Sequence, residues 1–117
     1  MWPFASTTEM KINRIDDRFS VTGQIRPEQV ARVASLGYTT IVCARPDREE
    51  AGQPTFAEIA REAQRHGLKA VHVPVSGIPG VEQRDRFRNA MATCDGPALG
   101  YCRSGARAAN LYAALAR

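Results

Sequence analysis

One stretch near the end of this 117-residue chain constrains the fold and the chemistry more than any other. An apolar run over residues 98–101 leads into Cys102, and a glycine and two arginines follow within five residues. A segment rich in alanine and leucine comes next, and its apolar residues recur with helical spacing. We therefore predict a strand, an anion-binding loop and a helix, in that order.

A loop of this kind favours a reactive thiolate. Backbone N–H groups around the start of a helix point at a bound anion, and the helix dipole adds positive potential there. We expect the Cys102 sulfur to lie among these groups, so that the thiolate is stabilised and nucleophilic at neutral pH. Arg107 carries a planar charged fork that suits a tetrahedral oxyanion. The sequence therefore predicts Cys102 and Arg107 as the catalytic residues.

The residues between these two are predicted to bind the substrate anion. They are Arg103, Ser104, Gly105 and Ala106. Gly105 provides the backbone freedom that a tight loop requires. Arg103 either contacts the substrate oxyanion or points outward at the rim. Ser104 either donates a hydrogen bond to the Cys102 sulfur or caps the following helix.

The loop length resembles one family of cysteine enzymes more than another. Protein tyrosine and dual-specificity phosphatases have five residues between cysteine and arginine and usually a histidine before the cysteine. Here four residues separate Cys102 from Arg107, and Tyr101 stands in place of the histidine. Rhodanese sulfurtransferases use a Cys-Arg-x-Gly-x-Arg loop, which residues 102–107 match at every fixed position. A smaller loop suits one sulfur atom, whereas a wider one suits a phosphate.

Four segments together resemble the beta-lactamase-hydrolase-like phosphatase-like domain over roughly residues 11 to 116. They are residues 19–24, 41–50, 71–75 and the cysteine loop. The resemblance implies a dual-specificity-phosphatase fold, sulfurtransferase activity, and a metallo-β-lactamase-type persulfide dioxygenase as a partner or fused domain. It implies no metal and no organic cofactor.

Strand and helix patterns alternate along the chain. Apolar strand patterns fall within 12–24, 38–43, 69–75 and 99–102, and helical patterns follow Pro27, Thr55, Gly80 and Gly105. We predict an α/β fold with a mainly parallel sheet of four to five strands flanked by helices. The family resemblance implies that this fold is similar to that of protein tyrosine and dual-specificity phosphatases. Residues 11–117 form one domain and residues 1–10 a flexible arm, in which the role of Trp2 and Phe4 is left open.

Parallel strands bind ligands at their carboxyl ends. That edge is expected to gather residues 43–45, residues 75–80 and the cysteine loop into one cleft. Arg45 and Glu49 are spaced to form an ion pair that supports this cleft.

Composition excludes several classes of function. The hydrophobic fraction is 44%, and no apolar run approaches the length that spans a bilayer. The net charge is +4, but the basic residues are scattered and do not indicate nucleic-acid binding. The three cysteines and two histidines lack the spacing of a zinc site. We expect a cytoplasmic protein that binds neither membrane, nucleic acid nor metal.

The segment after the third predicted strand distinguishes two enzymatic hypotheses. A phosphatase needs a general acid to protonate its leaving alkoxide, and residues 76–80 contain no carboxylate before Glu82. Sulfur transfer from thiosulfate or a persulfide releases sulfite or a thiolate and needs no such proton. We therefore predict a sulfurtransferase acting through a Cys102 persulfide. The alternatives are a phosphatase for phosphate esters and a non-catalytic module that binds an anion or a persulfide.

Overall fold

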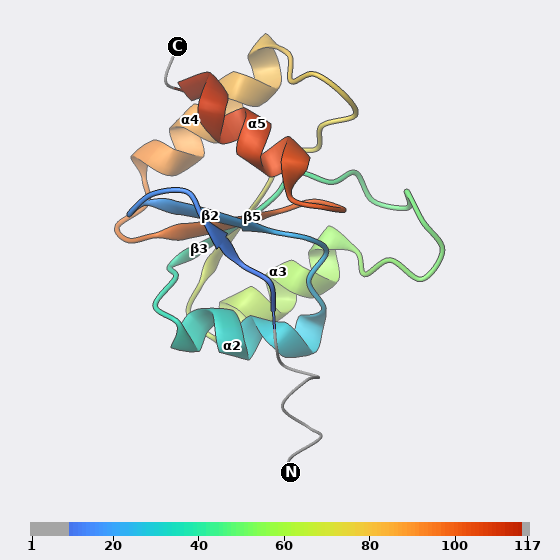
Figure 1. The fold of residues 1–117 in the computed structure, drawn as a ribbon. Helices are drawn as coiled ribbons and strands as arrows, with labels where there is room; N and C mark the ends of the chain where they lie inside the picture. Colours follow the sequence, from blue (N-terminus) through green and yellow to red (C-terminus); the bar gives the residue numbers. More distant parts are fainter. Residues whose placement is uncertain (1–9, 116–117) are drawn as a thin grey trace.

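A five-stranded sheet lies between two pairs of helices (Figure 1). The computed structural model describes residues 10–115. The strand order is β1-β2-β5-β3-β4, and β1 is the antiparallel strand at one edge. The strands are β1 (Asn13–Arg14), β2 (Phe19–Thr22), β3 (Thr40–Cys43), β4 (Lys69–His72) and β5 (Ala98–Tyr101). This confirms the predicted α/β fold with a mainly parallel sheet.

Two helices cover each face of the sheet (Figure 1). The helical segments are the 3₁₀ turn η1 (Pro27–Gln29), α2 (Val30–Ser35), α3 (Phe56–Arg65), α4 (Val81–Ala92) and α5 (Ala106–Leu115). α3 starts where a capping box predicts, because the Glu58 amide donates to Thr55 Oγ1 at 3.1 Å. The chain then leaves this helix through Gly67, whose φ of +78° suits glycine.

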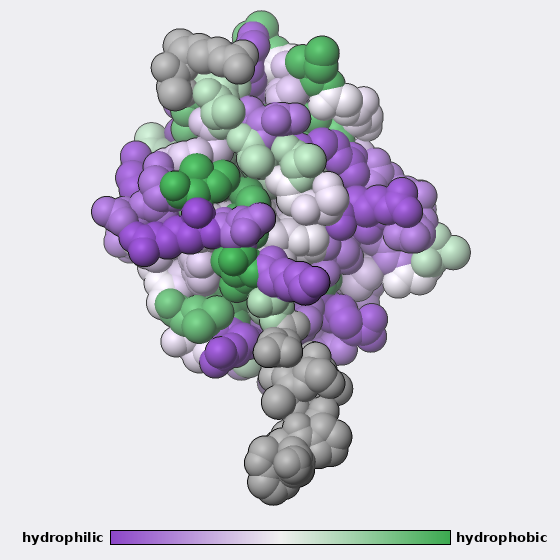
Figure 2. Space-filling model, in the orientation of Figure 1, coloured by the Kyte–Doolittle hydropathy of each residue, from purple (hydrophilic) through white to green (hydrophobic). Residues whose placement is uncertain are grey.

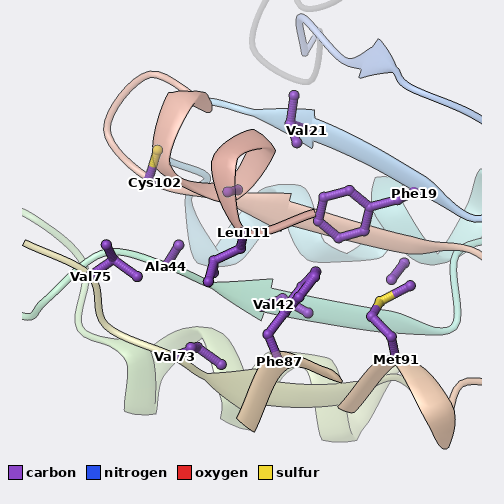
Figure 3. Packing of buried hydrophobic residues seen from close by; sticks show 12 residues of the cluster. Phe19, Val21, Val42, Ala44, Val73, Val75, Phe87, Met91, Cys102 and Leu111 are labelled. Carbon is purple, nitrogen blue, oxygen red and sulfur yellow. The ribbon is translucent and has the colours of Figure 1, made fainter. Parts of the chain in front are cut away.

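Alternation along the strands divides the core between the two faces. Val42 and Cys102 belong to the cluster under α4 and α5, whereas Ile41 and Leu99 belong to the cluster over α2 and α3. In Figure 3, Cys102 and Val75 lie at one end of this cluster and Met91 lies at the other. The cysteine therefore sits where the hydrophobic core meets the carboxyl edge of the sheet.

A glycine in β5 brings α5 close to the sheet. A Cβ on Gly100 would lie 2.5 Å from a ring carbon of Phe19 and 3.0 Å from the Cβ of Ala108. Because neither neighbour has room to yield in a packed core, only glycine fits there. This close approach sets the helix directly behind the loop that joins β5 to α5.

Two predicted strand boundaries were wrong by a few residues. β4 ends at His72 rather than Val75, because the regular register is lost after Val73: the Val73 amide donates to the Cys43 carbonyl at 2.8 Å, but the Val75 amide donates to Ala44 at 3.1 Å, one residue out of step. β5 spans 98–101 rather than 99–102, since Ala98 pairs with Phe19 in β2 and the chain turns into the loop at Cys102. The hairpin of β1 and β2 turns at Asp16, whose Oδ1 accepts the Arg18 amide at 2.8 Å.

Hydrophilic side chains border smaller groups of hydrophobic ones on the face in Figure 2. Across the part of the chain that the structure describes, each helix is too short or too polar to cross a bilayer. The predicted arm over 1–10, with Trp2 and Phe4, lies outside the described residues except for Met10.

Candidate active site

The predicted loop after β5 is curled around the Cys102 sulfur. The Gly105 N–H donates to Cys102 Sγ at 3.0 Å, and α5 begins one residue later. Cys102 is 1% exposed, so the sulfur lies at the bottom of the loop rather than on the surface. A substrate therefore has to present a slim, exposed atom to reach it.

The loop amides lower the pKa of Cys102. Burial acts first and in the opposite direction, because it disfavours the thiolate, but the amides of Ala108, Ser104, Arg107 and Gly105 together outweigh it and bring the pKa below its ordinary value. These are N–H groups at the N-terminus of α5, where the helix dipole also favours negative charge. The geometry thus stabilises a nucleophilic thiolate at the predicted position.

Gly105 is required by its backbone conformation. Its φ is +97°, and a Cβ built there would lie 3.3 Å from the carbonyl oxygen of Thr22. On the neighbouring side, a Cβ on Gly23 would lie 3.0 Å from the carbonyl oxygen of Arg103. The end of β2 is thus pressed against the loop, which holds the Gly105 amide toward the sulfur.

Arg107 is held by two elements from elsewhere in the chain. Its Nη1 donates to Glu49 Oε2 and to the Val75 carbonyl, both at 2.7 Å, and its Nη2 donates to Glu49 Oε1 at 2.8 Å. These bonds use three of the five guanidinium N–H groups. The remaining N–H groups are available to an anion at the sulfur.

Glu49 is ionised because of the two arginines that it bridges. Arg107 first and Arg45 second lower its pKa to about 2. In return Glu49 is the main cause that raises the pKa of Arg107, and the nearby Cys102 thiolate adds to it. The predicted pair of Arg45 and Glu49 is therefore extended to Arg107.

Arg45 is the buried centre of this network. Its side chain is 2% exposed, and Nε donates to Glu49 at 2.8 Å, Nη1 to Gln24 at 3.0 Å and Nη2 to Glu50 at 3.1 Å. The ring of His72 also hydrogen-bonds to the Arg45 carbonyl at 2.8 Å. A single guanidinium thus joins the end of β2 to the loop after β3.

The other loop residues occupy distinct positions. The side chain of Arg103 is 71% exposed, and its nearest acidic partner is Glu50 at 3.9 Å, so it lies at the rim. Ser104 Oγ accepts the Ala106 amide at 3.3 Å, a local turn contact just before α5. The Ala106 amide is therefore directed to Ser104 and not to the sulfur.

Sequence reasoning missed Gln24, Glu50 and the carbonyl of Val75. Every residue has a backbone carbonyl, so the residue type at Val75 could not indicate its role. Gln24 and Glu50 are ordinary polar residues in polar segments. The position of Gln24 at the end of the first predicted strand pattern was the one available signal, since strand ends meet at the ligand-binding edge.

The carboxylates brought to the loop are poor proton donors. Glu49 is ionised, and Glu50 accepts a hydrogen bond from Arg45. Glu82 and Asp85 lie within α4, where Asp85 pairs with Arg88 at 2.8 Å. Among residues 10–115, the carboxylates that touch the loop are thus paired with arginines rather than placed as general acids.

The other cysteines do not share the setting of Cys102. Cys43 is buried on the opposite face of the sheet, and burial raises its pKa. Its neighbour Tyr101 is 1% exposed, and burial raises the pKa of its phenol as well. Within residues 10–115, no group of three or more His, Cys, Asp or Glu side chains could hold a metal ion.

The sequence matches one family model over nearly its whole length. The family described as "Beta-lactamase hydrolase-like protein, phosphatase-like domain" matches residues 11–116. A beta-lactamase hydrolase-like protein of Xylella fastidiosa is 39% identical over 105 residues, which are 89% of this chain and 24% of that protein. The chain thus spans about a quarter of the length of the curated relatives that it matches.

Solved phosphatase structures share the fold. A putative phosphatase of Neisseria meningitidis is 33% identical and superposes with a TM-score of 0.79, covering 89% of this chain and 75% of that one. A protein named Tk-PTP is 21% identical with a TM-score of 0.62, covering 90% and 64%. The fold is that of the protein tyrosine and dual-specificity phosphatases.

Proposed function

Since the chain belongs to the phosphatase-like domain family of beta-lactamase hydrolase-like proteins, we propose that it is an enzyme in which the Cys102 thiolate attacks a small anion. The observation that carries the proposal is the 3.0 Å hydrogen bond from the Gly105 amide to the Cys102 sulfur. That amide and its neighbours lower the pKa of Cys102 despite its burial. A purely structural cysteine has no need of such a setting.

The electrophile that we propose is a sulfane sulfur. With thiosulfate, the thiolate attacks the outer sulfur, a new S–S bond forms, the old S–S bond breaks, and sulfite leaves with the bonding electron pair. The product is a Cys102 persulfide, and a thiol, sulfite or cyanide then removes its outer sulfur. Two observations support this electrophile. Sulfite leaves without needing a proton, which suits a loop whose carboxylates are paired with arginines, and only four residues separate Cys102 from Arg107.

Phosphate ester cleavage is the second candidate, and the comparisons favour it over sulfur transfer. The relatives of known structure are named as phosphatases, both at 33% and at lower identity. In this reaction the thiolate would attack phosphorus, the P–O bond would break, and water would later release phosphate from the phosphocysteine. Without a protonated carboxyl at the loop, the enzyme would favour aryl esters, whose leaving groups are stable as anions.

One assay separates these activities. Purified protein and Cys102→Ser are each supplied with thiosulfate plus cyanide, and separately with an aryl phosphate. Thiocyanate formation that depends on Cys102 supports sulfur transfer, and Cys102-dependent phosphate release supports the phosphatase. If both are absent but thiosulfate still raises the melting temperature, the domain is a binding module. Mass spectrometry for one added sulfur on Cys102 checks the persulfide directly.

A persulfide dioxygenase partner stays a prediction of the sequence. A pull-down with such an enzyme would test it, using Cys102→Ser to distinguish docking from sulfur delivery.

A further inference from the structure

An open depression of about 420 Å³ adjoins the outer side of the cysteine loop. Its wall includes Gln24, Arg26, Glu50, Gly52, Gln53 and Arg103. The volume is in the range of small-molecule sites, and the apolar members of the lining are only Ala51 and Pro54. The chemistry of this wall suits a charged, hydrated group better than an aromatic ring.

Arg103 is the side chain in this wall with the most donors to offer. It follows Cys102 directly in the chain, yet its side chain is 71% exposed and turns to the rim rather than to the sulfur. The 3.9 Å that separate it from Glu50 Oε2 are too long for a hydrogen bond. Glu50 already accepts from Arg45 at 3.1 Å through its other oxygen. The N–H donors of the Arg103 guanidinium are thus not used by Glu50 and can bind a ligand.

The neighbouring polar groups are engaged within the protein. Gln24 Oε1 accepts from Arg45, and Gln53 Nε2 donates to the Pro46 carbonyl at 2.9 Å. Arg26, which also lines the depression, is exposed and bound to Glu28 through Nε at 2.6 Å. The site therefore offers two guanidinium groups of unequal freedom.

We propose that Arg103 binds a carboxylate on the non-reacting part of the sulfur donor, so that the preferred substrate is an organic persulfide with an acidic tail. This rests on the proposed function. The Cys102 thiolate attacks the outer sulfur of R–S–SH, one S–S bond forms as another breaks, and RS⁻ leaves. The proton of the donor stays on the transferred sulfur. Arg103 is then a specificity residue beside the reaction, while Arg107 serves the reacting group.

The test uses two donors that differ in one group. The persulfides of 3-mercaptopropionate and of 2-mercaptoethanol have similar size, but only the first carries a carboxylate. We expect the wild type to prefer the acidic donor. Arg103→Gln should raise the KM for the acidic donor about tenfold, and this increase should be at least fivefold larger than the increase in KM for the neutral donor. Arg61→Gln, which removes an exposed charge on α3, is the matched control and leaves both donors unchanged. Equal losses on both donors, or no preference in the wild type, would overturn the proposal.

A binding measurement distinguishes this inference from the sulfur-transfer proposal. If neither donor adds a sulfur to Cys102, the proposed reaction fails. Binding of the carboxylate at Arg103 is then measured separately, by NMR titration of Cys102→Ser with 3-mercaptopropionate and with 2-mercaptoethanol. Backbone shifts at Gly52 and Arg103 with the acid alone, lost in the double variant with Arg103→Gln, support the site. Identical shifts with both compounds, or none, refute it.

Discussion

Arg107 and Glu49 lie 58 residues apart in the sequence and face each other through two hydrogen bonds of 2.7 and 2.8 Å. Such a paired contact fixes the plane of the guanidinium as well as its position. Because Glu49 also accepts from the buried Arg45, the direction of Arg107 depends on the packing beneath the loop. The arginine that the sequence predicts as catalytic is thus oriented by contacts with distant residues as well as by its own helix.

Glu49→Gln should lower the free energy of unfolding by an amount that depends on pH. The pKa of Glu49 is about 2 in the folded protein against 4.5 ordinarily. A lowered carboxyl pKa stabilises the fold above about pH 4.5, and this contribution is lost as the pH falls from 4.5 toward 2. We expect Glu49→Gln to cost about 1–2 kcal/mol at pH 7 and progressively less toward pH 2.

Urea denaturation at several pH values measures this difference. Glu82→Gln, at an exposed position on α4, is the control. A cost for Glu49→Gln that stays constant between pH 7 and pH 2 would mean that the two arginines do not hold the carboxylate as described.

Gly105→Ala should raise the pKa of Cys102 and also weaken the fold. The new Cβ strains a backbone at φ +97° and meets the Thr22 carbonyl, which displaces the amide that faces the sulfur. We expect a loss of about 1–2 kcal/mol and a shift of thiol alkylation to higher pH. Gly37→Ala provides the match, because its φ is +98° and nothing lies within 4 Å of the added Cβ.

Both glycine variants should lose stability in denaturation, since both force an alanine into the left-handed region, and Gly105→Ala should lose at least as much because its Cβ also meets the Thr22 carbonyl. Only Gly105→Ala should change the pH dependence of alkylation at Cys102. The same alkylation profile in both variants would disprove the part played by the Gly105 amide.

Iodoacetamide should label Cys102 at lower pH than Cys43. The loop amides bring the pKa of Cys102 below its ordinary value, whereas burial raises that of Cys43. Because the thiolate is the reactive form, the labelling rate of Cys102 should reach its plateau at lower pH. Peptide mass spectrometry between pH 5 and 10 resolves the sites, and an ordinary thiol profile for Cys102 would count against the thiolate.

Arg45→Lys should destabilise the protein although it keeps the charge. The three nitrogens of the Arg45 guanidinium reach three different side chains from a position that is 2% exposed. An ammonium group cannot match that planar geometry, so we expect a loss of about 2–4 kcal/mol in urea denaturation. Arg61→Lys on α3 should change the midpoint little, and an equally small effect at Arg45 would contradict its role as the centre of the network.

Local patterns were sufficient for most of the fold. The helical stripes, the capping box at Thr55 and the apolar strands each depend on neighbouring residues, so they can be read without tertiary information. The family resemblance likewise predicted the phosphatase fold that the comparisons confirm. The errors lay at the ends of β4 and β5, where pairing with other strands decides the boundary.

The candidate site was predictable only in part. The run Cys102-Arg103-Ser104-Gly105-Ala106-Arg107 carries a tight loop and a helix start in its own residue types, and the structure curls it around the sulfur. The sequence left two orientations open for Arg103, toward the substrate or outward at the rim. In the structure its side chain is 71% exposed and lies at the rim. Its nearest acidic partner, Glu50 at 3.9 Å, comes from the distant loop after β3.

Turn chemistry and hydrophobic periodicity act over a few residues, so the local sequence was enough to predict a strand, an amide-lined loop with a cysteine, and a helix. The contacts of Arg107 with Glu49 and the Val75 carbonyl, and of Glu49 with Arg45, became visible in the folded chain alone. Those contacts follow from the strand order β2-β5-β3-β4, which brings the carboxyl ends of separate strands to one edge. The physical reason is that contacts across the sheet are chosen by packing of the whole core, which no short segment encodes.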